Sequence, residues 1–318
     1  PRGDVLRSHQ LSDKLCNLML LCPDHHKLID DFPNRLSEAD LLEMKRKHEE
    51  AIATQCGLIY KETSEVLMVS SPIKGRTPVT INFNQCADAV MPEKRVASVR
   101  GQRIKVEIEE DHSPGYWESA VRALNRRFGL TVSAILEEDP NAHFSVFPLA
   151  PMPLIMKLGY MIGDKARADV FQFSRACDSW NWSTKEQTNS FSAKKQVVRD
   201  GGRIALVFSL TADIATTRIT EVYDADILYF IRAARFGVDC IQSPADLAAF
   251  WSIYQSTCDE IKNTYPEVQE IGVFPAMPVS AAFEVGRRYM PGVYPRFRIY
   301  DDDNGFFETI TIGGKEND

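Results

Sequence analysis

Three side chains that can bind metals lie close together near the start of the chain: Cys22, His25 and His26. A cysteine and a histidine separated by two residues can reach one zinc ion together. The adjacent His26 then points elsewhere and can contact a second, catalytic metal ion. We therefore expect two neighbouring histidines with two different tasks, one structural and one chemical.

The surrounding residues indicate how this group is positioned. The apolar run at 17–21 is expected to form a strand, and Pro23 stands where a helix can begin. Ser37 and Asp40 resemble a capping box, which predicts a helix over about 38–53. A bare Cys-x-x-His sequence is more often a buried thiol beside an ordinary histidine, and only this context favours a metal site.

In this context, the sequence Asn-x4-Cys-x2-His-His closely resembles the second half of an HNH nuclease motif. The resemblance implies that Asn17 orients the site and that His26 is a ligand of a catalytic Mg²⁺ or similar ion. It also implies that Cys22 and His25 complete a structural Zn²⁺ site with two upstream cysteines, in a ββα-metal fold that hydrolyses double-stranded DNA. The first histidine and those cysteines are not in this chain, and Pro-Arg-Gly-Asp at 1–4 looks like the segment that follows them. The HNH domain is therefore expected to be incomplete here.

Composition limits what the rest of the chain can be. Its length of 318 residues, 44% of them hydrophobic, exceeds one ordinary domain and predicts two. A net charge of −7 argues against a surface that binds nucleic acid over its whole extent, so any DNA contact is expected to be local. Seven cysteines without a signal peptide suggest a reducing cytoplasm rather than a disulfide framework. We expect no membrane span, because the apolar stretch at 144–163 contains prolines and a lysine.

An internal repeat is the most informative feature of the remaining sequence. From residue 102 onward, β-rich segments alternate with helical ones, which is an α/β pattern. Within it, five identities share an offset of 127 residues: Val146-Phe147-Pro148 with Val273-Phe274-Pro275, Pro151 with Pro278, and Gly159 with Gly286. The predicted strand at 170–173 falls on 297–300 at the same offset. We therefore predict a pseudo-dimer that arose by duplication.

In both copies an apolar strand leads into a proline-containing turn, and a helix starts directly after it. Such helix starts bind anions in α/β folds, so two of them suit a ligand with several phosphates, such as a cyclic oligonucleotide. The alternative is that the two copies merely pack together. The candidate ligand-binding residues lie at the helix starts (Pro151, Met152, Met277, Pro278), in a polar turn (Ser209, Thr211), or suit a phosphate (Arg175) or a stacked base (Trp180, Trp182). Plain core packing explains the two tryptophans equally well.

The segments at 144–182 and 205–214 resemble the SAVED sensor domain, a family related to CARF domains and found in bacterial CBASS anti-phage systems. The resemblance covers most of residues 101–318 and implies two fused CARF-like, Rossmann-like halves, after an HNH remnant at 1–55 and a connector at 56–100. It also implies that a cyclic di- or trinucleotide binds this domain, drives assembly into a dimer or tetramer, and activates DNA degradation.

Two other functions stay open. One is a ligand sensor whose HNH remnant is a structural zinc module, which predicts no DNA cleavage. The other is an HNH restriction endonuclease whose second domain inspects DNA, which predicts a basic stripe on that domain and activity without a small ligand. The acidic net charge counts against the endonuclease.

Overall fold

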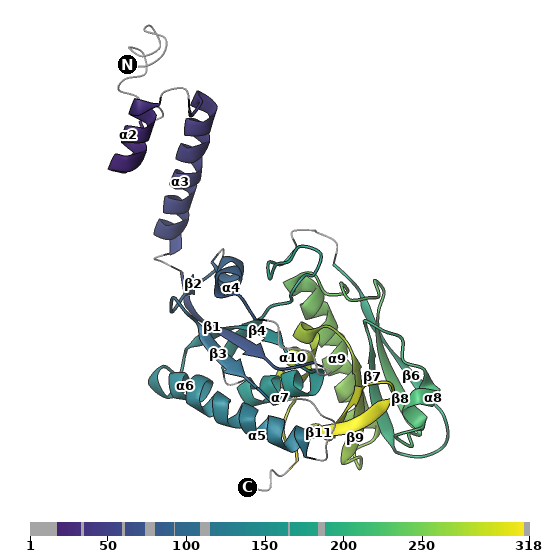
Figure 1. Cartoon of the computed structure of the whole chain (residues 1–318). Helices are drawn as coiled ribbons and strands as arrows, with labels where there is room; N and C mark the ends of the chain where they lie inside the picture. Colours follow the sequence, from purple (N-terminus) through teal and green to yellow (C-terminus); the bar gives the residue numbers. More distant parts are fainter. Residues whose placement is uncertain are drawn as a thin grey trace. The chain divides into compact units, whose positions relative to one another are not determined.

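The computed structural model divides the chain into two compact units, Pro1–Lys61 and Glu62–Asp318, and each unit is described by itself. The structure describes residues 18–32, 35–58, 61–73, 80–91, 93–108, 115–164, 166–183 and 188–314 (Figure 1). Asn17, which was predicted to orient a nuclease site, lies outside the described residues.

Two helices are described in the first unit: α2 (Pro23–Asp31) and α3 (Glu38–Leu58). Pro23 takes the first position of α2, where its missing N–H costs nothing. The predicted capping box is confirmed, because the Ser37 N–H and hydroxyl donate to Asp40 Oδ2 and the Asp40 N–H donates to Ser37 Oγ. The predicted strand is wrong for residues 18–21, because no described strand of this unit pairs with them. Leu20 accordingly remains 89% exposed.

The second unit contains two sheets, and the first of them is wholly parallel, in the order β3-β1-β4-β5 with the short β2 beside β1. Its strands are β1 (Thr63–Ser70), β2 (Arg95–Val96), β3 (Gln102–Lys105), β4 (His143–Leu149) and β5 (Arg167–Val170). Its helices are α4 (Phe83–Val90), α5 (Tyr116–Phe128), which continues through the π-helix η2 (Gly129–Ser133) into α6 (Ala134–Glu138), and α7 (Met152–Ile162). Parallel sheets are covered on both faces, which explains the continuous apolar runs in β1 and β4.

The segment at 56–100, expected to be a connector, instead contributes β1 to the first sheet. Val66 to Val69 are all 3% exposed or less, and β1 pairs with β3 on one side and with β4 on the other. The unbroken run Val-Leu-Met-Val is the pattern of a strand buried on both faces. Strands that are buried in this way belong to a domain core rather than to a connector.

The second sheet has six strands in the order β11-β10-β9-β7-β8-β6. They are β6 (Phe191–Val197), β7 (Ile204–Ser209), β8 (Ile227–Ala233), β9 (Glu270–Ala276), β10 (Arg296–Asp302) and β11 (Phe306–Ile312). Its helices are α8 (Thr216–Thr220), α9 (Pro244–Thr264) and α10 (Val279–Arg287). The inner strands are parallel, and the two outermost, β6 and β11, are antiparallel to their neighbours.

The predicted duplication is confirmed, because the two halves repeat one topology. The order β1-α4-β3-α5-β4-α7-β5 corresponds to β7-α8-β8-α9-β9-α10-β10. In the first half β1 pairs with β4, the strand before α7, and Leu67 is opposite Val146. In the second half β7 pairs with β9, the strand before α10, and Leu206 is opposite Val273. Among the described strands, β6 and β11 of the second half have no counterpart in the first.

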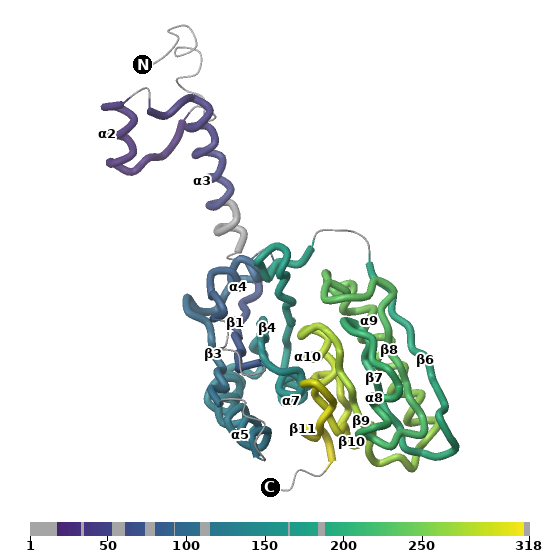
Figure 2. The backbone as a smooth tube through the Cα atoms, turned by 45° about the vertical axis from the view of Figure 1, so that its right-hand side comes forward, coloured from purple at the N-terminus to yellow at the C-terminus, as the bar shows by residue number. Residues whose placement is uncertain are grey.

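The helices α7 and α10 pack against each other between the two sheets (Figure 2). Their repeated glycines lie where the two backbones meet. A β-carbon on Gly159 would overlap the carbonyl oxygen of Phe283, and one on Gly286 would overlap that of Met156. Phe283 and Met156 are themselves related by the repeat, so the crossing obeys the pseudo-twofold symmetry. Glycine is required at both positions because no side chain fits there.

Candidate ligand site

A pocket of about 270 Å³ lies between the two halves, at the carboxyl ends of their strands. It is lined by residues that end or follow parallel strands: Ile73, Ala150, Pro151, Met152, Gln172, Phe173, Arg175, Thr211, Val238, Asp239, Met277, Pro278, Val279 and Asp301. Ligands of open α/β folds bind in this position, outside the carboxyl ends of the strands. The fold therefore places a ligand-sized opening on the pseudo-twofold axis.

The two helix starts at this pocket offer fewer free amides than the sequence suggested. Pro151 is the N-cap of α7, and Pro153, which has no N–H, follows within its first turn. In α10 the N–H and the hydroxyl of Ser280 both donate to Gln172 Oε1, at 3.1 and 2.9 Å. Gln172 comes from the first half, so it caps a helix of the second. Recognition here must therefore rest largely on side chains.

The polar side chains of the pocket are few and varied. Arg175 is exposed and is the single cation among the described residues that line the pocket. Thr211 adds a hydroxyl, and Asp239 and Asp301 add carboxylates. Most other lining residues are apolar, which is typical of sites that hold a ring system and orient it with a few polar groups. The carboxylates accept hydrogen bonds and can read the amino groups of bases.

Six of the residues nominated from the sequence line this one pocket: Pro151, Met152, Arg175, Thr211, Met277 and Pro278. Ser209 does not reach it, because Ser209 is fully buried and its hydroxyl accepts a hydrogen bond from the Ile214 N–H at 3.3 Å.

The two tryptophans lie elsewhere. Trp180 is only 1% exposed, with its edge against Phe147 and Phe173 at ring-centroid distances of 5.1 Å. Trp180 cannot stack on a ligand there, and core packing explains its position. Its ring also supports Phe173 at the pocket wall. Trp182 lines a different groove.

The sequence did not indicate the loop that carries Val238 and Asp239. Two buried side chains anchor this loop. The Asn189 amide donates to the carbonyl oxygens of Arg235 and Cys240, at 3.0 and 2.8 Å. The carboxylate of Asp246 accepts hydrogen bonds from the backbone amides of Gln242 and Ser243, just after the loop, and from that of Asn189. Gln172, Phe173 and Asp301 were missed as well; Asp301 is the last residue but one of β10, the counterpart of β5, so the repeat could have indicated this strand end.

In the first unit the predicted metal ligands lie at the start of α2. Cys22 Sγ is 2.9 Å from His25 Nδ1. The backbone N–H of His25 and then its ring hold the pKa of the Cys22 thiol below its usual value, and the thiol raises the pKa of His25. His26 faces Asp30 instead, with 3.1 Å between Nδ1 and Oδ2. The two histidines thus have different partners.

The pair formed by Cys22 and His25 fits half of a tetrahedral zinc site, since both are usual zinc ligands and their donor atoms face each other. Within the described ranges, no cluster of three or more His, Cys, Asp or Glu side chains is placed to hold a metal ion. Further zinc ligands would have to come from outside these ranges.

The fold and pocket define an α/β domain built from two similar halves, with a pocket between them. Residues 129–312 match the model of the SAVED family, described as the SMODS-associated and fused to various effectors sensor domain. This match covers more than half of the chain, and the chain belongs to the SAVED family.

Among solved structures, the chain is similar to the SAVED/CARF-domain containing receptor Cap4 of Acinetobacter baumannii with the cyclic trinucleotide 2′3′3′-cAAA. The TM-score is 0.50 at 12% identity, over 94% of this chain and 63% of that one. The Cap4 receptor of Moraxella osloensis matches with a TM-score of 0.47 at 12% identity, over 95% of this chain and 63% of that one. The chain thus spans less than two thirds of the length of these receptors. The first likeness supports the SAVED fold.

Among curated proteins, none matches this chain. Of the described helices, none has the length and apolar character needed to cross a membrane.

Proposed function

We propose that the pocket at the strand ends binds a cyclic di- or trinucleotide and that the chain is the sensing part of a CBASS anti-phage effector. The observation that carries this proposal is the convergence of six of the nine nominated residues, from both halves of the duplication, in a single pocket. The Acinetobacter receptor, whose structure holds a cyclic trinucleotide, indicates the ligand class.

The symmetry of the pocket suits a ring-shaped ligand. Three pairs of lining positions are related by the repeat: Ala150 with Met277, Pro151 with Pro278, and Met152 with Val279. A cyclic oligonucleotide presents the same chemical unit two or three times around a ring. Two of its units can therefore meet nearly equivalent surfaces, one from each half.

The size of the pocket indicates how such a ligand would lie. At about 270 Å³, it is slightly smaller than the usual range of about 300–1,000 Å³ for ligand sites. A cyclic trinucleotide would insert part of its ring and leave the rest across the mouth. There Val238 is 60% exposed, and Phe236 of the same loop is 54% exposed. Bound ligand and exposed apolar side chains would together form a surface for a second copy, which supports ligand-driven assembly into a dimer or tetramer.

Calorimetry with cyclic diadenylate, cyclic triadenylate and linear triadenylate tests the proposed binding. We expect saturable binding of at least one cyclic ligand and much weaker binding of the linear one. Met152→Trp places a large ring in the pocket and should remove binding, whereas Met290→Trp, outside the pocket, should not. The proposed ligand class is wrong if no cyclic oligonucleotide binds, or if both variants bind like the parent chain.

We further propose that the natural full-length protein is a metal-dependent HNH nuclease. Support comes from the different surroundings of the two adjacent histidines: His25 faces Cys22, as a zinc ligand would, while His26 lies apart from that pair. Cys22 and His25 would hold a structural Zn²⁺, and His26 would bind the catalytic Mg²⁺. A bound Mg²⁺ supplies stabilisation of the departing oxygen of a phosphodiester.

Degradation of plasmid DNA with Mg²⁺, with and without the cyclic ligand, tests the nuclease proposal. We expect ligand-dependent cleavage by the full-length protein that His26→Ala abolishes while ligand binding persists. His48→Ala, an exposed histidine on α3, is the matched control and should cleave normally. Binding without cleavage would leave a sensor whose zinc module is structural. Cleavage that needs no ligand would favour an endonuclease with a DNA-inspecting domain.

A further inference from the structure

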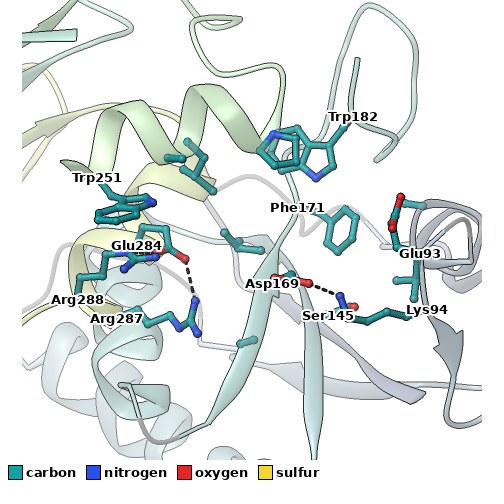
Figure 3. A pocket seen from close by; sticks show the side chains of 17 residues that line it. Glu93, Lys94, Ser145, Asp169, Phe171, Trp182, Trp251, Glu284, Arg287 and Arg288 are labelled. Carbon is teal, nitrogen blue, oxygen red and sulfur yellow. Dashed lines mark hydrogen bonds and ion pairs between the residues drawn. The ribbon is translucent and has the colours of Figure 1, made fainter. Parts of the chain in front are cut away.

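A second pocket, of about 280 Å³, lies along the free edge of the first sheet and shares no lining residue with the ligand pocket. It follows β5 and is closed by α4 on one side and by α9 and α10 on the other. Figure 3 shows Trp182 and Phe171 on one wall and Trp251, Arg287 and Arg288 on the opposite wall. We call this pocket the β5 groove.

The duplication shows why the β5 groove is open. In the second half, the counterpart of β5 is β10, and β11 pairs with it in antiparallel fashion. Phe306, Ile310 and Ile312 of β11 are buried, and Phe307 packs near Trp117 of α5, at a ring-centroid distance of 6.4 Å. In the first half, no described strand takes the corresponding place beside β5. Among the described strands, the same architecture therefore leaves the position beside β5 open, whereas the corresponding position beside β10 is occupied by β11.

The two copies also differ in chemistry at this position. At the repeat offset, Arg287 and Arg288 stand where the first half has Tyr160 and Met161. At the edge that β11 covers, α7 thus presents the ring of Tyr160 and the thioether of Met161. At the open edge beside β5, the end of α10 presents two guanidinium groups. This difference argues that the groove beside β5 binds a negatively charged ligand and not an apolar strand.

The two arginines are held in place from behind. Glu284, whose side chain is 4% exposed, lies 3.3 Å from Arg287 Nη1 and 2.6 Å from Arg288 Nε. The Arg288 guanidinium also lies over Trp251, 3.9 Å from the ring centroid. Nε of Arg287 is buried and has no hydrogen-bond partner in the described part of the chain. Fixed guanidinium groups with N–H donors to spare suit a phosphate.

The opposite wall offers an aromatic surface. Trp182 is partly buried and stacks on Phe171, with ring centroids 6.2 Å apart and an angle of 26° between the planes. Beside it, the Lys94 ammonium pairs with Asp169 at 2.7 Å, so each charge already has a partner. Arg287 and Arg288 share the single carboxylate of Glu284, so a net positive charge remains there to bind an anion, and the indole of Trp182 provides a face for a base.

We propose that the β5 groove binds a nucleoside monophosphate unit, with its phosphate on Arg287 and Arg288 and its base against Trp182. Arg287, Arg288 and Trp182 are the binding residues. Trp251 and Glu284 position the guanidinium groups. The site is separate from the cyclic-ligand pocket, so it exists whether or not that pocket has the function proposed above.

Titration of the chain with AMP, followed by tryptophan fluorescence and calorimetry, tests this assignment. We expect AMP to bind more tightly than adenosine or ribose 5-phosphate, because each of these lacks one half of the recognised unit. Arg287→Gln and Trp182→Leu should each weaken AMP binding by roughly tenfold or more. Trp182→Phe should retain most of the binding, and Arg122→Ala, on an exposed helix face outside both pockets, should leave AMP binding unchanged.

Competition between AMP and single-stranded hexadeoxyadenylate shows whether the groove binds a nucleotide of a nucleic acid strand or a free nucleotide. Displacement of AMP by this strand, lost in Arg287→Gln, would assign the unit to a nucleic acid strand; no displacement would assign it to a free nucleotide. Circular dichroism of each variant confirms that it is folded. The proposal is overturned if AMP does not bind at millimolar concentration, or if folded Arg287→Gln and Trp182→Leu both bind AMP as the parent chain does.

Discussion

Replacing Gly286 with alanine should weaken the contact between the two halves of the sensor domain. The new β-carbon would overlap the Met156 carbonyl oxygen and crowd the Tyr160 amide, and both of these belong to the backbone of α7. Backbone cannot turn aside as a flexible side chain can, so α7 or α10 must shift against its sheet. Overpacking of this kind costs about 3 kcal/mol.

The gain in helix propensity from glycine to alanine, about 1 kcal/mol, offsets part of that cost. The net loss in the free energy of unfolding is then about 2 kcal/mol, which lowers the Tm of a domain of this size by about 4–8 °C. Differential scanning calorimetry measures this shift. Gly129→Ala is the matched control, because Gly129 has helical angles and no atom within 4 Å of an added β-carbon. An equal Tm for the two variants would refute the close-packed crossing of α7 and α10.

Three further predictions concern charged side chains. Arg175→Ala should weaken binding of the cyclic ligand by roughly tenfold in calorimetry, through loss of a charge-assisted hydrogen bond to phosphate, while Arg122→Ala on an exposed helix face should not. Asp246→Ala should lower the free energy of unfolding, measured by urea denaturation, by at least about 3 kcal/mol, because buried amides, including that of Asn189, lose their acceptor. Unchanged stability would contradict the anchoring of the loop. Hydrogen bonds from His143, and secondarily from Lys94, lower the pKa of Asp169 below its usual value. The contribution of Asp169 to the free energy of unfolding is therefore complete at neutral pH and is lost as the pH falls below about 4. Asp169→Asn should therefore show a smaller drop in Tm between pH 6 and pH 3 than the parent chain, and an equal drop would count against this ion pair.

Much of the sensor fold could be predicted because the repeat leaves identical residues where the backbone demands them. Gly159 and Gly286 persist because two helices cross there without room for a side chain. Pro151 and Pro278 mark the turns between strand and helix, and so they also locate the pocket. The strand β1 was misjudged because its counterpart, β7, lies 139 residues further along the chain (Leu67 corresponds to Leu206) and not 127, so the repeat offset does not align the two strands.

The parts of the site that escaped prediction depend on contacts distant in sequence. The loop with Val238 and Asp239 reaches the pocket because Asn189 and Asp246 hold its ends, and no spacing pattern links these residues. For Trp180, alternation with Trp182 fitted both stacking and burial, and only the rings of Phe147 and Phe173 decide between them. Burial of an aromatic ring is a property of the packed fold, which local sequence does not specify.

A crystal structure of the chain with cyclic triadenylate tests the central proposal most directly. We predict that the ligand lies between the two halves against Pro151 and Pro278, with a phosphate near Arg175 and part of the ring across the mouth beside Val238. Cyclic triadenylate bound elsewhere, with the space between those two prolines empty, would contradict the assignment of this pocket as the sensor site.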